Sequence, residues 1–343
     1  MPFGEQASRD DDHSAANMWW LGGYEFLFFE LILPPIETFG EVFGRWVAQL
    51  WGGAEGRHIA VDGKSLRRSF DRAAGRSAVH SVAAFASAQG LVLGQVSVRD
   101  KENEIVAIPR LLTLLDLRGA TVTIDAMGCQ TAIARAITEA GGHYVLQVKN
   151  NQPTLRRQIE AFFADAARTA RPLDDPAPKV QTDEATDAGH GRIETRRCHL
   201  SKDLSYVDGA ADWAALTAIA KVERIRHNKS TGQTSTESAY YILSDPEATA
   251  ARVNDLVRAH WTIENRIHWV LDVTFDEDRC RVRKGNAAEN FAIIKRAAIN
   301  MLRNAPNPGS KRQKVSIARR RRICLMNQAY RDTVLKLTPV EAT

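Results

Sequence analysis

Two short apolar segments of this chain each end in an aspartate followed by glycine or another small residue. They read IAVDGK, in which the acid is Asp62, and VTIDAMG, in which it is Asp125. A carboxylate at the end of a buried strand is costly unless it is paired or binds a cation. A purely structural role stays open, because a strand-ending aspartate often caps the next turn or helix. The two segments together predict a pair of acids at the edge of one sheet.

The residues around these acids predict alternating strands and helices. Three closely spaced strands, HIAVDGKSL, VHSVAAFAS and LVLGQVSV, favour an antiparallel meander. Further strands are predicted at TVTID and HYVLQVK. Helical spacing covers residues 104–117, 130–140 and 153–163, the second ending at a Gly-Gly pair and the third beginning at a proline. This order predicts an α/β fold.

The pattern changes in the middle of the chain. Residues 171–188 are rich in Pro, Asp and Thr and are expected to form a linker or loop. The runs RIETRRCHL, ALTAIAKVERI and SAYYILS are β-type. They predict a β-rich insertion, about residues 179–245, within a larger α/β domain. Helical patterns resume over residues 248–272 and 287–303.

The net charge of +5 hides an asymmetry. Residues 1–56 hold nine acids and two bases, a net of −7, so the remaining 287 residues hold 44 bases and 32 acids, a net of +12. A basic body favours a polyanionic partner through phosphate contacts, although a solvated basic surface is an alternative. Four cysteines without a CxxC pair argue against a disulfide scaffold and favour a cytoplasmic protein.

One stretch, MWWLGGYEFLFFELILPPI at residues 18–36, resembles a membrane segment. Glu25 and Glu30 interrupt it and two prolines end it, whereas a bilayer span needs about 20 apolar residues. We therefore predict an amphipathic or core-packing helix and no membrane partner.

Several blocks of the sequence resemble one enzyme family. They are DGKSLRRS, KENEIVAIPRLLTLLDLRGATVTIDAMGCQ, GGHYVLQVKNNQPTL, GHGRIETR and HWTIENRIHWVLDVTFDEDRCRVRKGNAAENFA. In this order they resemble the DDE transposases of bacterial insertion sequences, in the H-repeat-associated or ISAs-type branch. The resemblance covers about 250 residues, from Arg57 to Arg303.

The resemblance implies an RNase H-like catalytic domain over residues 57–303, with a mixed five-stranded sheet flanked by helices. The β-rich insertion then precedes the last catalytic helix. Carried over residue by residue, the acidic triad is Asp62, Asp125 and Glu264, all three as ligands of Mg²⁺, with Mn²⁺ as a substitute. The implied activity is DNA cleavage and strand transfer at insertion-sequence ends, by a homodimer in the DNA complex at the nucleoid.

The acids explain this chemistry. Cleaving a phosphodiester requires an activated water or 3′-hydroxyl and a stabilised leaving oxygen, and a pair of Mg²⁺ ions supplies both. Carboxylate oxygens are the ligands that such hard cations take. Two alternatives remain open: an inactive, DNA-binding transposase remnant, and a metal-dependent nuclease without transposition.

One departure affects the last catalytic helix. Related transposases carry a Tyr-Arg-Glu-Lys pattern there, whereas this chain has Val257, His260 and Leu271 at the positions of Tyr, Arg and Lys. Arg258 and Arg266 are the expected substitutes for the missing phosphate contact.

Other basic residues are candidate DNA contacts, each with a structural alternative. Alternating bases on an extended segment favour a phosphate track, and the HGR segment is a candidate contact for a DNA end. The predicted DNA-binding set is Lys64, Arg67, Lys149, His190, Arg192, Arg258, His260, Arg266, Arg281, Arg283 and Lys284.

Three further patterns have competing interpretations. His260, Glu264 and His268 share one helix face, so a zinc site is conceivable, although the spacing does not match HExxH. Trp261 and Trp269 are expected to pack in the core, with stacking on a DNA base as the alternative. The acidic run at residues 272–278 is expected to be a solvated helix end rather than a metal site.

The two ends of the chain differ in charge. Residues 304–343 form a tail that, with Arg303, carries eight bases and no acids as far as Arg322, which is typical of a flexible arm on nucleic acid. Residues 1–56 match the longer helical region of similar transposases poorly and are acidic. We therefore expect this chain to be poor at complete transposition by itself.

Overall fold

The computed structural model describes residues 35–54, 56–73, 75–98, 103–168, 179–189, 191–309 and 314–335. Nearly all of the membrane-like stretch at residues 18–36 lies outside these ranges, and so does His190, one of the predicted DNA contacts. In the described part of the chain, no helix is long and apolar enough to cross a membrane.

A mixed sheet forms the centre of the fold. The meander predicted from the sequence is present as β1 (His58–Ser65), β2 (His80–Ala86) and β3 (Leu91–Val98), paired antiparallel. β4 (Thr121–Ile124) and β5 (His143–Val148) run parallel to β1, which gives the order β3-β2-β1-β4-β5. The RNase H-like arrangement expected from the resemblance is therefore confirmed.

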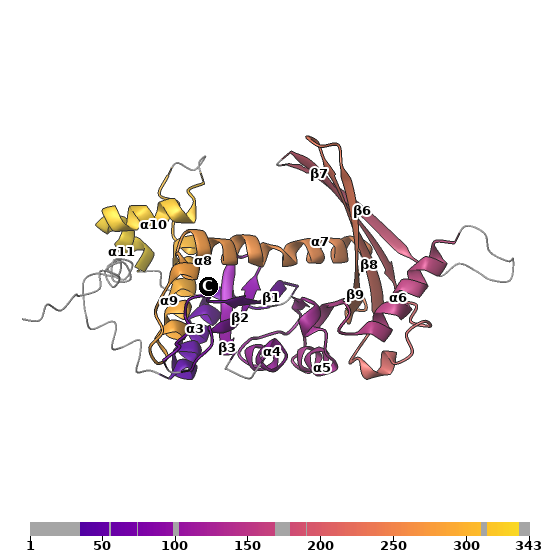
Figure 1. The fold of residues 1–343 in the computed structure, drawn as a ribbon, viewed down its shortest axis with the longest axis horizontal. Helices are drawn as coiled ribbons and strands as arrows, with labels where there is room; N and C mark the ends of the chain where they lie inside the picture. Colours follow the sequence, from indigo (N-terminus) through magenta and orange to yellow (C-terminus); the bar gives the residue numbers. More distant parts are fainter. Residues whose placement is uncertain are drawn as a thin grey trace, which may run out of the picture.

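The insertion extends this sheet instead of forming a separate one (Figure 1). It contributes β6 (Gln181–Gly189), β7 (Arg192–Ser201), β8 (Ala218–Asn228) and β9 (Thr234–Leu243). β9 pairs antiparallel with β5, so the expected five strands become nine in one continuous sheet.

The prediction of a loop over residues 171–188 is wrong for its last part, because β6 begins at Gln181. This strand is the outer edge of the sheet, and its residues alternate between exposed and half-buried. An edge strand needs no continuous apolar pattern and is commonly polar, so its composition resembles that of a loop.

Helices cover the two faces of the sheet differently. α4 (Glu104–Leu112) and α5 (Thr131–Glu139) lie on one face, and α7 (Ala250–His260) crosses the other (Figure 1). α6 (Pro153–Ala166) begins at the predicted proline. α4 ends five residues before the predicted end, since the chain turns there and Leu117 enters the core from the turn.

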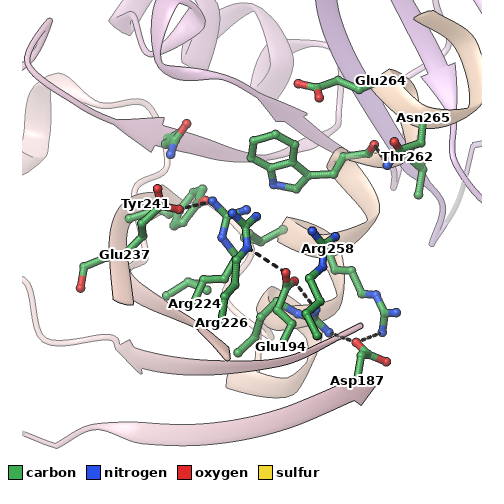
Figure 2. A pocket seen from close by; sticks show the side chains of 18 of the residues that line it. Asp187, Glu194, Arg224, Arg226, Glu237, Tyr241, Arg258, Thr262, Glu264 and Asn265 are labelled. Atoms are coloured by element: carbon green, nitrogen blue, oxygen red, sulfur yellow. Dashed lines mark hydrogen bonds and ion pairs between the residues drawn. The ribbon is translucent and has the colours of Figure 1, made fainter. Parts of the chain in front are cut away.

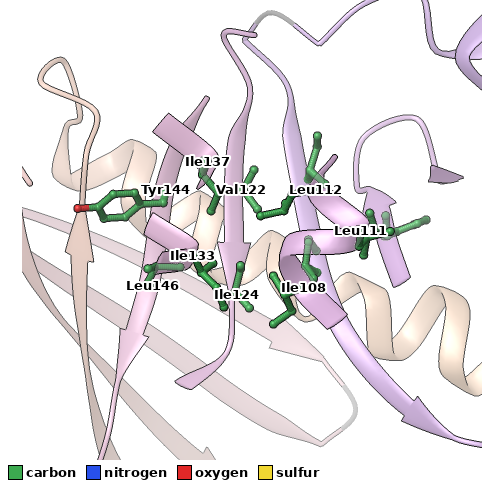
Figure 3. Packing of buried hydrophobic residues seen from close by; sticks show 14 of the residues in the cluster. Ile108, Leu111, Leu112, Val122, Ile124, Ile133, Ile137, Tyr144 and Leu146 are labelled. Atoms are coloured by element: carbon green, nitrogen blue, oxygen red, sulfur yellow. The ribbon is translucent and has the colours of Figure 1, made fainter. Parts of the chain in front are cut away.

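Alternation along β4 sorts its side chains between these faces. Val122 and Ile124 pack against Ile108 of α4 and Ile133 of α5 in the buried cluster of Figure 3. Since successive strand residues point to opposite faces, Thr123 and the following Asp125 face α7 instead. The apolar residues of TVTID therefore pack in the core, and Thr123 and Asp125 face α7.

The helix predicted over residues 248–272 is interrupted. After α7 the chain forms a π-helical turn, η4 (Glu264–His268), and then α8 (Trp269–Val273). The amide of Trp269 bonds to the carbonyl of Glu264, five residues earlier, which defines the wider turn. Single π turns within α-helices are frequent at functional sites. Here the turn begins at the third predicted catalytic acid.

The described part of the basic tail, residues 304–309 and 314–335, is largely helical, contrary to the flexible arm expected from its composition. α10 (Ile317–Met326) and α11 (Gln328–Leu335) pack on α9 (Ala287–Asn304). Arg320 caps α9, with Nη1 2.7 Å from the carbonyl of Leu302 and 2.8 Å from that of Ala305. Part of the positive charge thus closes a helix end, which the dipole of α9 favours.

At the other end of the described chain, α3 (Ile36–Trp51) packs against β3 and α9 and places Val47 and Trp51 in the main core. The segment of residues 1–56 therefore includes at least one helix that packs on the central sheet and contributes to the main core.

The acidic run at residues 272–278 is an internal ion-pair network and not a solvated end. Glu277, in the short helix η5 (Glu277–Arg279), is fully buried. Its Oε1 lies 3.5 Å from the guanidinium of Arg296 and 3.8 Å from the ammonium of Lys295, both buried on α9. Buried charges require such partners, so the network fixes α9 against the segment that follows α8.

Candidate active site

The strand register places the two predicted aspartates side by side. Val61 of β1 pairs with Ile124 of β4, so Asp62 and Asp125 occupy the next positions along two parallel, adjacent strands. Both follow a run of buried residues at the C-terminal ends of their apolar segments. The pair of acids predicted at one sheet edge is therefore formed.

Asp62 is the more buried of the two acids. Its Oδ1 accepts a hydrogen bond from the amide of Gly63 at 2.9 Å, and its Oδ2 lies 3.6 Å from Nδ1 of His268. Burial, opposed by the amide bond of Gly63 and aided by the charges of Asp125 and Glu264, raises the pKa of Asp62 to about 7. Burial also lowers the pKa of His268 to about 3, so the imidazole is neutral at physiological pH.

Asp125 caps the short helix η2 (Ala126–Gly128) and accepts a hydrogen bond from the amide of Met127 at 3.1 Å. This is the capping role that a strand-ending aspartate can have. Burial, followed by the charge of Glu104, raises the pKa of Asp125, while the amides and Lys149 oppose the shift. Capping and metal binding are compatible, since a carboxylate has two oxygens and several acceptor positions.

Glu264 comes from the π turn and is exposed. Its charge acts on the pKa of Asp62, which places the two carboxylates in electrostatic contact. The three acids thus come from β1, the end of β4 and the helix that crosses the sheet.

This donor set fits a divalent cation in chemistry. The charges of Asp125 and Glu264 disfavour the ionised form of Asp62, and a hard cation with a preference for oxygen ligands would relieve this repulsion. Within the described residues, however, no three acids, histidines or cysteines are close enough to enclose one ion as they stand. Asp62, Asp125 and Glu264 are therefore candidate ligands whose side chains do not enclose one ion in this arrangement.

A fourth acid, Glu104, also reaches the site and was missed in the sequence. A Cβ atom added to Gly63 would lie 2.1 Å from Oε1 of Glu104, so only glycine permits this approach. Oε1 also lies 2.5 Å from Nε2 of His80, whose Nδ1 bonds the hydroxyl of Ser65 at 2.8 Å. The cue available in the sequence was the glycine directly after Asp62.

A groove of about 1010 Å³ runs from Glu264 between α7 and the insertion strands (Figure 2). Its lining combines Glu264 and Trp261 with basic side chains from the insertion, α7 and the end of β5, namely Lys149, Arg192, Arg196, Arg224, Arg226 and Arg258. Arg196, Arg224 and Arg226 were not predicted as contacts. Their spacing on strands was the available signal, because residues two apart share a face.

Acids partly neutralise this lining. Arg226 pairs with Glu194 at 3.0 Å, and Arg258 of α7 pairs with Asp187 of β6 at 2.8 Å. The Asp187 pair joins the insertion to the catalytic helix. Lys149 and Arg192 have no ion pair with another described residue, so their charges are available for a ligand.

Comparison with known proteins decides the family. The profile of a family described as Transposase DDE domain matches residues 53–301. This chain belongs to the DDE transposase family. The match spans β1, β4 and the π turn, and therefore includes all three acids of the site.

Named relatives agree with this assignment. "Putative transposase YncI" of Escherichia coli O157:H7 is 36% identical over 300 residues, which cover 87% of this chain and 74% of the relative. "H repeat-associated putative transposase YhhI" of Escherichia coli (strain K12) is 35% identical over 301 residues, covering 87% and 76%. An uncharacterized protein of Xanthobacter autotrophicus is 42% identical over 217 residues, covering 63% and 69%. The resemblance to the H-repeat-associated branch is confirmed.

Some predicted DNA contacts of this DDE transposase are engaged internally. Lys64 is buried, with Nζ 2.7 Å from Asp272 and 3.6 Å from Asp278. Arg67 is exposed and pairs with Asp278 at 3.3 Å. The position of Lys64 favours a structural role over the phosphate contact expected from its sequence neighbourhood.

His260 and Arg266 have comparable internal partners. His260 bonds the hydroxyl of Thr123 at 2.9 Å, and its burial lowers its pKa to about 4. Arg266 donates from Nη1 to the carbonyl of Ser87 at 2.7 Å. These internal partners favour structural roles for His260 and Arg266, whereas Arg258 lines the groove. A phosphate contact by any of the three stays a prediction.

Among the predicted DNA contacts that follow η5, one has internal partners and two are exposed. Arg283 donates to the carbonyl of Arg68 at 2.9 Å and stacks over Phe70 with its guanidinium carbon 4.6 Å from the ring centroid. Arg281 and Lys284 are exposed. A contact with DNA stays a prediction for this pair.

The remaining local predictions concern the catalytic helix. A zinc site at His260, Glu264 and His268 is absent from the described residues. The prediction that both tryptophans pack in the core is wrong, because Trp261 is 43% exposed and Trp269 is 58% exposed. The guanidinium carbon of Arg224 lies 5.2 Å from the ring centroid of Trp261, at the groove.

Proposed function

We propose that this chain cleaves DNA at insertion-sequence ends and transfers the cut strand, with Mg²⁺, or Mn²⁺ in its place, at Asp62, Asp125 and Glu264. The observation that carries the proposal is the register of β1 and β4, which puts two strand-ending acids side by side beside the acidic π turn. The family assignment supports DNA as the substrate.

The chain's own residues have distinct parts in this proposal. The amides of Gly63 and Met127 hold the carboxylates of Asp62 and Asp125 in fixed orientations. Glu264 completes the ligand set from the side of the groove. A bound divalent cation would activate the attacking hydroxyl and stabilise the leaving oxygen.

The groove supplies a path for the DNA. Its cationic wall ends at Glu264, so a phosphate backbone bound there would lead directly to the acids. Arg258 and Arg226 can exchange their carboxylate partners for phosphate, because guanidinium binds both in the same bidentate geometry. We also propose that two copies assemble in the DNA complex. Binding to DNA would place the protein at the nucleoid.

Cleavage of the parent element's end DNA tests this function. We expect Mg²⁺-dependent nicking at the element's ends and joining of the cut end to a target strand. End-specific gel shifts without cleavage would indicate an inactive remnant. Cleavage without preference for the inverted repeats would indicate a nuclease. Light scattering of the complex tests for two copies.

The groove makes a specific prediction for Lys149 and Arg192. Each substitution to alanine should weaken DNA binding and reduce the slope of log affinity against log salt by about 1, because one phosphate contact releases about 0.9 counterion. Arg118→Ala is the control, since Arg118 is exposed beside Asp116 and precedes β4 at the end remote from Asp125. Slopes equal to that of the wild type would remove these residues from the DNA path.

The folded tail changes how its charge should be tested. Deleting it would remove the helices that pack on α9, so a charge change is more specific. Arg319 and Arg322 are exposed on α10. The double substitution to glutamine should lower the salt slope by about 2 if both contact phosphate. An unchanged slope, measured with an unchanged melting temperature, would assign the tail a structural role alone.

A further inference from the structure

Three polar side chains, of which His58 and Thr123 are buried and His260 is half-buried, form a hydrogen-bonded bridge near the acids. Nε2 of His58 lies 2.7 Å from Oγ1 of Thr123, and the same oxygen lies 2.9 Å from Nδ1 of His260. His58 is on β1, Thr123 on β4 and His260 at the end of α7. One threonine hydroxyl therefore links the three elements from which the catalytic acids come.

Burial keeps both imidazoles of the bridge neutral. It lowers the pKa of His58 to about 3 and that of His260 to about 4. A neutral imidazole offers one donor and one acceptor nitrogen, and a hydroxyl can donate to one ring while accepting from the other. The bridge is therefore complete only when Thr123 supplies a hydroxyl, since no other side chain of the described residues bonds these two nitrogens.

Each member of the bridge precedes an acid at a spacing that keeps both on the same face. His58 lies four residues before Asp62 on β1, so both side chains project toward α7. Thr123 lies two residues before Asp125 on the same face. His260 ends α7 four residues before the acid of the π turn. The bridge members thus precede the three carboxylates by four, two and four residues in the chain.

The end of α7 and the π turn have further polar contacts with the sheet. The hydroxyl of Ser87 donates to the carbonyl of Ala259 at 3.3 Å, and Arg266 donates to the carbonyl of Ser87 at 2.7 Å. Both contacts reach the end of β2, and His268 of the turn approaches β1, with its Nδ1 3.6 Å from Oδ2 of Asp62. His260 is therefore the side chain that joins α7 to β4 by a direct hydrogen bond among the described residues.

We propose that the His58–Thr123–His260 bridge is a positioning element that fixes the π turn over β1 and β4, so that Glu264 can complete the metal site with Asp62 and Asp125. The inference rests on the proposed function, because it assumes that the three acids share a metal. The bridge would act through the backbones that carry the acids, and mutation of residues that orient metal ligands typically weakens metal binding by about 10–100-fold.

The test compares Thr123→Val, which removes the hydroxyl at nearly constant volume, with Thr123→Ser, which keeps it. Mn²⁺ binding to the full chain without DNA is measured by electron paramagnetic resonance titration. We expect about tenfold weaker binding for the valine variant and binding within about twofold of wild type for the serine variant. Thr121→Val is the matched control, because Thr121 is buried on the same strand face but lies outside the bridge.

Two outcomes would overturn the bridge while leaving the proposed function intact. One is wild-type Mn²⁺ affinity in folded Thr123→Val, and the other is an equal loss in Thr123→Ser. DNA binding should be unchanged in both variants, which separates positioning from general damage. Absence of Mn²⁺ binding by the wild type would instead overturn the metal site itself, and the bridge with it.

If Thr123→Val does not fold, the histidine end of the bridge decides the question. His260→Asn keeps a hydrogen-bonding atom near the position of Nδ1, whereas His260→Leu does not. We expect the asparagine variant to bind Mn²⁺ more tightly than the leucine variant by about tenfold. Equal affinities would contradict the positioning role.

Discussion

Asp62→Asn, Asp125→Asn and Glu264→Gln should each reduce end-DNA cleavage by at least about a thousandfold. The amides keep the size of the side chains but lose the negative charge that holds a divalent cation. Metal ions contribute several kcal/mol of transition-state stabilisation, and about 4 kcal/mol corresponds to this factor. Single-turnover cleavage at saturating protein and Mg²⁺ measures the effect.

Binding assays separate a lost metal ligand from a lost fold. All three variants should bind end DNA with near wild-type affinity, because none of the acids contributes positive charge to the groove. Asp116→Asn is a suitable control, since Asp116 is exposed and pairs with Arg118 away from the site. Wild-type cleavage by any triad variant would exclude that residue from the site.

The contribution of Asp62 to the stability of the metal-free protein should fall as the pH rises from about 4 to 7, so the stability of Asp62→Asn relative to wild type should increase over this range. The pKa of Asp62 is 3.8 in the unfolded chain and about 7 in the fold. Between these values the unfolded chain has released the proton while the folded protein retains it, so rising pH favours unfolding. Through this difference in pKa, Asp62 lowers the free energy of unfolding by at most about 4 kcal/mol above pH 7.

The sign of this effect is opposite to that of a salt-bridged acid. Below pH 4 both states are protonated and Asp62 costs nothing, whereas above pH 7 its buried charge destabilises the fold by the full amount. Asp62→Asn should therefore be more stable than wild type at pH 8 in a chelator, and nearly equal to it at pH 4. Denaturant unfolding at both pH values measures the difference.

Added Mg²⁺ provides the second half of this test. A cation that binds the ionised site stabilises the folded state by mass action, so it should stabilise wild type and have little effect on Asp62→Asn. Asp116→Asn serves again as the control, because Arg118 holds the pKa of Asp116 at about 2, below the tested range. A pH dependence that is equal in wild type and Asp62→Asn would contradict the buried charge at this position.

The sequence by itself determined the strands that carry the two candidate catalytic aspartates. Alternation in IAVDGK and TVTID defined two buried strands, and the acid at each end identified the site, because these patterns depend on neighbouring residues only. Glu264 followed from the resemblance and agrees with its place beside the aspartates. Local periodicity was sufficient to predict an element wherever one face of that element is buried.

The tertiary structure decided what distant residues do for the site. Pairing of β5 with β9 joins positions about a hundred residues apart and turns the insertion into part of the sheet. The roles of Lys64 and His260 depend on Asp272 and Thr123, partners that no local pattern identifies. A basic or aromatic side chain has the same sequence signature whether it binds DNA or closes a buried network. Only the fold brings its partner within hydrogen-bonding distance, and that partner decides between the two roles.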